Sequence, residues 1–134
     1  LPRCTPVKVL GIQIGRIKDM TDSIFTRIIN REIPSDIVFE DDQVIAFHDI
    51  QPQAPLHVLV VPKNPEYRNV VELADAAPQL LAHIVEVANK LAAELADGDF
   101  RLIFNSGEGA GQTVFHVHAH VLAGGLKEGT LAGN

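Results

Sequence analysis

Three histidines, His116, His118 and His120, alternate with apolar residues near the end of the chain. In a β-strand, alternate residues point to the same face, so we expect the three imidazoles to share one face of a sheet. The intervening residues, with Phe115 and Val121 at the two ends, would face the core. Buried imidazoles need hydrogen-bond partners and solvated faces seldom use histidine, so neither a core nor a plain polar surface explains the pattern well. The pattern predicts a functional site.

Histidines spaced in this way fit two kinds of chemistry. Two imidazoles at alternate strand positions can bind zinc when a third ligand comes from elsewhere. Alternatively, one neutral imidazole acts as a nucleophile near pH 7 while its neighbours orient it and shuttle protons. The segment that precedes the histidines helps to decide between these two interpretations.

Three glycines lie in that preceding segment, residues 106–113, which ends with Gly111, Gln112 and Thr113. Glycines allow backbone N–H groups to approach an anion closely, and the side chains of Gln112 and Thr113 can add donors to phosphate oxygens. The segment lacks the Gly-Lys-Ser/Thr ending of a P-loop, and an ordinary glycine turn is the alternative interpretation. Because a metal site needs no such cradle, the segment favours phosphate chemistry.

A fourth histidine, His57, lies in the apolar, β-rich run of residues 56–61. A lone histidine in such a run is more often a core residue with satisfied hydrogen bonds. A sheet could also bring this run beside the other histidines, where His57 could relay protons. The sequence leaves both interpretations open.

The elements that must position these residues follow from hydrophobic periodicity and capping signals. A short helix is expected after a cap at Asp22 or Ser23, ended by Pro34, and a long helix between an N-cap at Asp75 and Gly98. The expected strands cover residues 37–40, 43–47, 56–61, 100–104 and 114–122. This order predicts an α+β domain with an antiparallel five-stranded meander sheet, one short helix and one long helix. A sheet this small leaves an edge exposed, so pairing with a second copy is expected.

Composition and charge narrow the class of protein. The 134 residues, of which 46% are hydrophobic and 21% charged, suit one globular domain with one core. A formal net charge of −6 gives no basic field for nucleic acid, and no apolar run is long enough for a membrane span, so we expect neither partner. A single cysteine, Cys4, cannot form an intramolecular disulfide, which fits a reducing compartment and predicts a cytoplasmic location.

The chain is expected to contain one folded domain with an extension at each end. Met20 stands directly before the first helix signal, so residues 1–20 are expected to be a disordered extension, either added upstream of the natural start or genuine. Cys4 lies in that extension and is not expected to be a catalytic thiol. Residues 21–125 are expected to form the domain, and the glycine-containing residues 126–134 an irregular tail.

The histidine run, continued by Val121 and Leu122 and preceded by Gly111-Gln112-Thr113-Val114, resembles the signature of the histidine triad (HIT) superfamily. Within it, the chain looks most like the Hint branch, the histidine triad nucleotide-binding proteins, from about Asp22 to Gly125. The segments that resemble this branch are Ile24-Phe25, Ile33-Pro34, Phe39-Glu40-Asp41-Asp42, Ala46-Phe47-His48-Asp49-Ile50 and Pro52-Gln53-Ala54-Pro55 with His57. The fragile-histidine branch differs in the loop of residues 49–55 and typically has Gln in place of Asn105.

The resemblance implies a HIT-like fold, a homodimer whose sheets join across the two-fold axis, and a purine nucleoside phosphoramidase. His118 would attack the α-phosphorus of an AMP-type substrate and form a nucleotidyl-histidine that water hydrolyses, with no metal or cofactor. His120 and His57 would hold phosphate oxygens and manage protons, and His116 would lock the local geometry. The residues implied for phosphate and leaving group are Asn105, Gln112 and Thr113, with Asp49 on the ribose hydroxyls and Ile24, Phe25, Ile28, Phe47 and Ile50 against the base.

Two departures from the Hint branch bear on specificity. Thr113 stands where the branch usually has Ser, and the tail from Gly124 to Asn134 lacks the branch's Trp-Pro-Pro ending. The apolar residues implied for the base are equally well explained as ordinary core. Three alternative functions remain: a dinucleoside polyphosphate hydrolase or nucleotidylyl transferase of the same superfamily, a purine nucleotide-binding or scaffold protein, and a zinc-binding protein.

Overall fold

The computed structural model describes residues 23–130, which fall into two compact units divided between Ile33 and Pro34. The prediction for residues 1–20 lies outside the described residues. Of the expected tail, residues 126–130 are described, and they include a short 3₁₀ turn, η2 (Glu128–Thr130). None of the described helices is long and apolar enough to cross a membrane.

The first unit contains the short helix α2 (Ile24–Ile29). Ser23 caps it, because its hydroxyl accepts a hydrogen bond from the Thr26 N–H at 3.0 Å. Phe25 and Ile28 are buried, whereas Ile24 is half-exposed. The predicted helix and its cap are confirmed, but the helix ends before Pro34 is reached: Asn30 is the C-cap and Arg31 follows with a φ of +64°.

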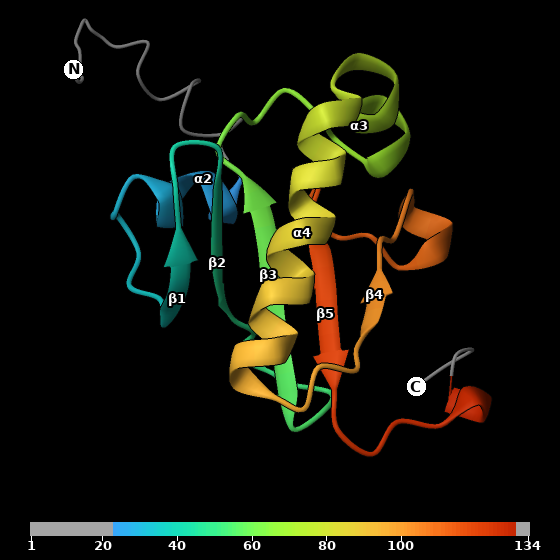
Figure 1. The fold of residues 1–134 in the computed structure, drawn as a ribbon. Coiled ribbons are helices and arrows are strands. Elements are labelled where there is room, and N and C mark those ends of the chain that lie inside the picture. The colour runs from blue at the N-terminus through green and yellow to red at the C-terminus, as the bar shows by residue number, and fades with distance from the viewer. Residues whose placement is uncertain (1–22, 131–134) are drawn as a thin grey trace, which may run out of the picture. The chain divides into compact units, whose positions relative to one another are not determined.

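Five antiparallel strands form the sheet of the second unit (Figure 1): β1 (Ile37–Glu40), β2 (Val44–His48), β3 (Leu56–Pro62), β4 (Arg101–Ile103) and β5 (Ala119–Ala123). The α+β class and the five-stranded antiparallel sheet are confirmed. The meander order is wrong, because the strands lie in the order β1-β2-β3-β5-β4. The helical connection after β3 delivers β4 to the far edge, and β5 returns between them to pair with both.

Two helices connect β3 to β4, where the sequence predicted one. Helix α3 (Val70–Ala76) is capped by Asn69, whose side chain accepts from the Glu72 N–H at 3.0 Å. Asp75 therefore lies inside α3 and caps nothing. Helix α4 (Pro78–Leu95) begins at a proline, which suits a first turn because the missing N–H has no partner there and which would break a continuous helix.

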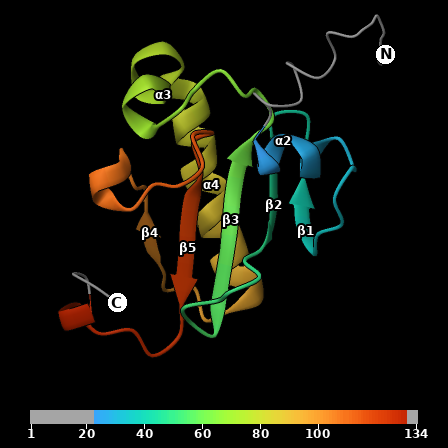
Figure 2. The same ribbon diagram turned by 180° about the vertical axis from the view of Figure 1, so that it is seen from behind.

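Helix α4 lies across one face of the sheet and forms the core with it, and Figure 2 shows the opposite face. The buried apolar residues of this core are Val44, Ala46, Leu56, Val58, Val60, Leu73, Ile84, Val87, Ala88, Leu91, Val117, Ala119, Val121 and Ala123. Because side chains alternate along a strand, His57 of β3 and His120 of β5 belong to the face that α4 does not cover.

The last strand begins later than predicted. β5 starts at Ala119, where the register pairs Ala119 with Val60, and β4 ends where Ile103 pairs with His120. Residues 114–118 therefore run past the end of β4 and outside the strand ladder. Val117 is buried as predicted, but Phe115, which was expected in the core, is 45% exposed.

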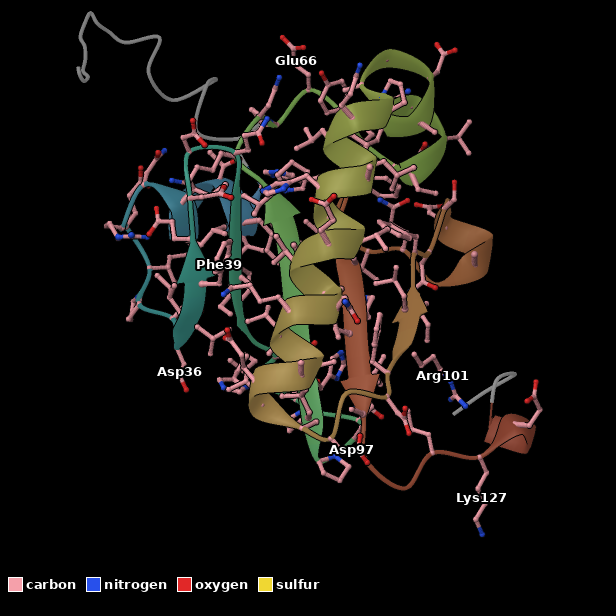
Figure 3. All side chains as sticks on the ribbon, in the orientation of Figure 1. Asp36, Phe39, Glu66, Asp97, Arg101 and Lys127 are labelled. Carbon is pink, nitrogen blue, oxygen red and sulfur yellow. The ribbon has the colours of Figure 1, made fainter. Side chains whose placement is uncertain are left out.

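The segment that follows β5 is tied to β4 through Arg101. Its guanidinium Nη2 donates to the Lys127 carbonyl at 2.8 Å, and Figure 3 labels both side chains at this end of the sheet. Gly124 makes the turn out of β5 with a φ of +102°, which favours glycine.

Candidate active site

Neighbouring strands bring His57 and His120 together. In the register of β3 and β5, His57 pairs with Leu122 and Leu59 pairs with His120, so the two histidines are diagonal neighbours on one face. The Nε2 atom of His57 lies 3.0 Å from the Nδ1 atom of His120. The sheet thus brings His57 beside the histidine run, which the sequence left open.

A backbone group fixes which nitrogen of His57 carries the hydrogen. The N–H of Gln53 donates to His57 Nδ1 at 3.0 Å, so neutral His57 carries its hydrogen on Nε2. That hydrogen faces His120 Nδ1 at 3.0 Å and the Asp49 carboxylate at 3.5 Å. His120 Nδ1 is therefore an acceptor, and neutral His120 carries its own hydrogen on Nε2.

His118 is held in the opposite tautomer by a carbonyl two residues away. Its Nδ1–H donates to the His116 carbonyl at 2.8 Å, which leaves the lone pair of the neutral ring on Nε2. The His118 and His120 rings lie edge to face, with centroids 5.1 Å apart. A neutral imidazole with its lone pair on Nε2 is the form in which histidine acts as a nucleophile.

His116 is a buried anchor. It is 1% exposed, and its Nε2–H donates to the Pro62 carbonyl at 2.7 Å. This bond ties the segment outside the strand to the last residue of β3. The position agrees with the locking role implied for His116, which stays a prediction.

Burial keeps the four histidines neutral near pH 7. It lowers the pKa of His116 and His118 below the ordinary value of 6.5. Burial also lowers the pKa of His57, against the opposing effect of the Asp49 carboxylate. The pKa of His120 falls to about 4, because burial acts together with the neighbouring His118 and His57. A neutral ring is the form that the nucleophilic role predicted for His118 requires.

Asp49, His57 and His120 also form a group whose potential ligand atoms lie within 4.8 Å of one another. In this arrangement His57 Nε2 is a donor, because Nδ1 already accepts the Gln53 N–H. A nitrogen that carries a hydrogen offers no lone pair to a metal. The donor set therefore fits a chain of hydrogen bonds better than a zinc site.

Asp49 lies at the end of β2, where the proline-containing loop begins. Its Oδ1 accepts from the Gln51 N–H at 2.8 Å, and its own N–H donates to the His57 carbonyl at 2.9 Å. The carboxylate is thus fixed beside His57, with 21% of the side chain exposed. The role implied for it on a ribose stays a prediction.

The glycine segment forms a closed loop around the 3₁₀ turn η1 (Glu108–Ala110). Gly111 takes a φ of +95°, and its N–H donates to the Glu108 carbonyl at 2.9 Å. Both side-chain N–H groups of Gln112 donate to carbonyls, of Arg68 at 2.6 Å and of Val114 at 2.9 Å. Direct donation to phosphate by Gly111 or by the Gln112 side chain would require breaking one of these bonds. Thr113 is exposed and Asn105 half-buried, and the phosphate roles implied for them stay predictions.

The residues implied for the base divide between the two units. Ile24, Phe25 and Ile28 belong to the first, and Phe47 and Ile50 to the second. Phe47 is buried and Ile50 is 91% exposed. Their convergence on one base stays a prediction.

Sequence reasoning missed the backbone groups that shape the site. The Gln53 N–H binds His57, and the carbonyls of Pro62, Tyr67 and Arg68 each bind a residue of the histidine run or the glycine loop. Every residue carries such groups, so no residue type marks them. A proline-rich loop directly before His57 was the only available signal.

The fold and site together define a class: an α+β domain whose antiparallel sheet presents hydrogen-bonded, neutral histidines. The family model of the HIT domain matches residues 30–125. An uncharacterised HIT-like protein of Synechocystis is 50% identical over 107 residues, 77% of this chain and 90% of that protein. The purine nucleoside phosphoramidase of Escherichia coli K12 is 45% identical over 105 residues, 77% of this chain and 87% of that protein.

Solved structures of HIT proteins have the same fold as this chain. A HIT family hydrolase from Clostridium thermocellum has a TM-score of 0.74 at 47% identity, covering 81% of this chain and 97% of that one. A histidine triad protein from Clostridium difficile has a TM-score of 0.73 at 45% identity, covering 80% and 94%. The chain therefore belongs to the HIT family. The superfamily prediction is confirmed, and relatives named as hydrolases support an enzyme.

Proposed function

We propose that this protein is a purine nucleoside phosphoramidase of the Hint branch, cleaving a P–N bond at the α-phosphate. The observation that carries the proposal is the hydrogen bond from His118 Nδ1–H to the His116 carbonyl, which puts the nucleophilic lone pair on Nε2. The phosphoramidase of Escherichia coli, 45% identical, supports the reaction class. The active protein is a homodimer in the cytoplasm.

In the first step, His118 Nε2 attacks the α-phosphorus. A histidine N–P bond forms, the P–N bond to the amine breaks, and the leaving nitrogen takes up one proton. That proton comes from solvent by way of His120 Nε2, and the Nε2–H of His57, 3.0 Å from His120 Nδ1, holds the His120 ring in place. The phosphorylated imidazole keeps its Nδ1–H on the His116 carbonyl, so the ring does not turn during the reaction.

In the second step, water attacks the phosphorus of the nucleotidyl-histidine. The N–P bond to His118 breaks, a nucleoside monophosphate leaves, and one proton returns to solvent. The lone pair is again on Nε2 of neutral His118. Preorganised donors rather than a metal stabilise the phosphoryl charge in both steps. The donors that we assign are Asn105, Thr113 and the Nε2–H of His120.

The nucleoside part of the substrate is bound by Asp49 and by apolar side chains. The Asp49 carboxylate accepts hydrogen bonds from the ribose hydroxyls, and the apolar side chains of Phe47 and Ile50 contact the purine. Asp49 is suited to this because its position is fixed by the Gln51 N–H.

The test is the ratio of kcat/KM for adenosine 5′-phosphoramidate to kcat/KM for diadenosine polyphosphate, with His118→Ala as the control. We expect the phosphoramidate to be preferred by orders of magnitude and the variant to be inactive. Preference for the polyphosphate would refute the branch and leave the histidine chemistry. Cleavage of neither, with AMP bound, would favour a nucleotide-binding protein. Cleavage lost on chelation would favour a zinc protein.

A further inference from the structure

We propose that Gln112 is a positioning residue: its side chain clamps the glycine loop to the β3–α3 connection and so sets the place of the His118 segment. This role differs from direct donation to phosphate. The inference rests on the proposed function only where it concerns catalysis, since the clamp itself can be tested without substrate.

The side chain of Gln112 uses both of its N–H donors, and its oxygen as well, within the protein. It is 3% exposed. Its Nε2 donates to the Arg68 and Val114 carbonyls at 2.6 and 2.9 Å, and its Oε1 accepts from the Gly107 N–H at 2.8 Å. A primary amide has two N–H donors, so none remains for a ligand.

Gln112 closes the glycine loop from both ends. Its side chain holds the Gly107 N–H, while its backbone N–H donates to the Gly107 carbonyl at 3.1 Å. Gly111 makes the turn with its positive φ. Gln112 therefore holds the loop in one closed conformation.

The acceptor of the clamp is itself fixed. The Arg68 N–H and guanidinium both bind the Glu72 carboxylate, at 3.0 and 2.8 Å, and Asn69 caps α3 one residue later. Arg68 therefore lies at the fixed start of α3. Because the Gln112 side chain is bound to the Arg68 carbonyl, the position of the glycine loop depends on the position of α3.

Two neighbouring carbonyls hold the chain on either side of His116. The Arg68 carbonyl binds Gln112, and the Tyr67 carbonyl accepts from the Val117 N–H at 2.9 Å. Val117 directly precedes His118. Because β5 begins only at Ala119, strand pairing does not position this stretch, and the carbonyl contacts do. A shift of about 1 Å in a reacting group can cost on the order of 10²-fold in rate, so loosening the clamp should show in kcat.

The experiment compares Gln112→Met, which keeps the length of the side chain and removes its polar atoms, with Gln79→Met, the same change at an exposed position of α4. We expect Gln112→Met to lower kcat for adenosine 5′-phosphoramidate by about 10²-fold. Its affinities for AMP and for adenosine should both stay unchanged. Its Val117 amide should lose protection from hydrogen exchange, and Gln79→Met should match the wild type throughout.

Other results would overturn the proposal. A direct phosphate contact would weaken AMP binding and leave adenosine binding and Val117 protection intact. Unchanged kcat in Gln112→Met would also refute it. If that variant does not fold, the wild-type protein decides by NMR: the Gln112 side-chain amide protons should be protected and unmoved by AMP, and a shift on AMP addition would refute the clamp. An inactive wild type would instead defeat the proposed function, while the exchange measurement would still test the clamp.

Discussion

His57 and His120 lie on paired strands, whereas the segment from Gln112 to His118 lies outside the sheet. The two histidines are positioned by the ladder of β3 and β5, five residue pairs in continuous register. The segment is positioned by single hydrogen bonds to the carbonyls of Pro62, Tyr67 and Arg68. Many backbone hydrogen bonds hold the two strands together, whereas few hold the segment. A single substitution should therefore displace the strand residues less than the residues of the segment.

The difference matches the chemistry assigned to each part. A ring that gives a proton to a leaving group needs a fixed orientation and a fixed neighbour, which the strands and the Gln53 N–H supply. A nucleophile needs a precise approach to phosphorus and a ring that does not turn, which the His116 carbonyl supplies to His118. Changes in the segment should therefore act on kcat and on stability together.

The largest stability effect is expected from His116→Ala. It removes a ring that is 1% exposed and leaves the Pro62 carbonyl without its 2.7 Å donor. A cavity and an unsatisfied buried acceptor together should lower the free energy of unfolding by about 2–4 kcal/mol. Urea denaturation measures this, with His48→Ala, whose side chain is 39% exposed, as the matched control. A loss no larger than that of the control would show that the segment is not anchored at His116.

The pH dependence of activity tests whether His118 reacts as a neutral ring. Burial lowers the pKa of His118, and the reactive ring is the neutral one, which predominates above that pKa. Therefore kcat/KM should stay level as the pH falls through 6.5, the ordinary histidine pKa, and decline only below it. A rate profile with half its plateau lost at or above pH 6.5 would contradict a buried neutral nucleophile.

The smallest effect is expected from a pair outside both regions. His83 of α4 donates to Asp41 in the β1–β2 turn at 2.7 Å. Asp41 raises the pKa of His83 in the folded protein. The pair therefore stabilises the fold fully below the pKa that His83 has in the unfolded chain. This stabilisation is lost as the pH rises through the pKa that His83 has in the folded protein. His83→Gln should cost about 0.5–1 kcal/mol at mildly acid pH and less above it, with kcat unchanged. Equal losses at both pH values would contradict the charged pair.

The sequence anticipated what depends on side-chain pattern. Alternation correctly placed Val117, Ala119 and Val121 in the core, and capping signals correctly placed the start of α2 at Ser23. These features depend on residues close in sequence, so local propensity is enough to reveal them.

Features that depend on distant partners could not be read in this way. The insertion of β5 between β3 and β4 and the late start of β5 both depend on tertiary neighbours. The same holds for Gln112, which looks like a phosphate donor in sequence. Its partners are backbone N–H and carbonyl groups, which no residue type marks. The division of the long helix at Pro78 has a local cause, because proline suits a first turn and breaks a continuous helix.

Attack of His118 Nε2 on phosphorus leaves a covalent product that can be trapped. The protein is mixed with adenosine 5′-phosphoramidate, quenched in alkali within the first turnover, digested and analysed by mass spectrometry. The account predicts an adenylyl group on His118 of the wild type, on Nε2, formed and lost at rates that match turnover. Turnover with no adduct, or an adduct on His57 or His120 instead, would contradict it.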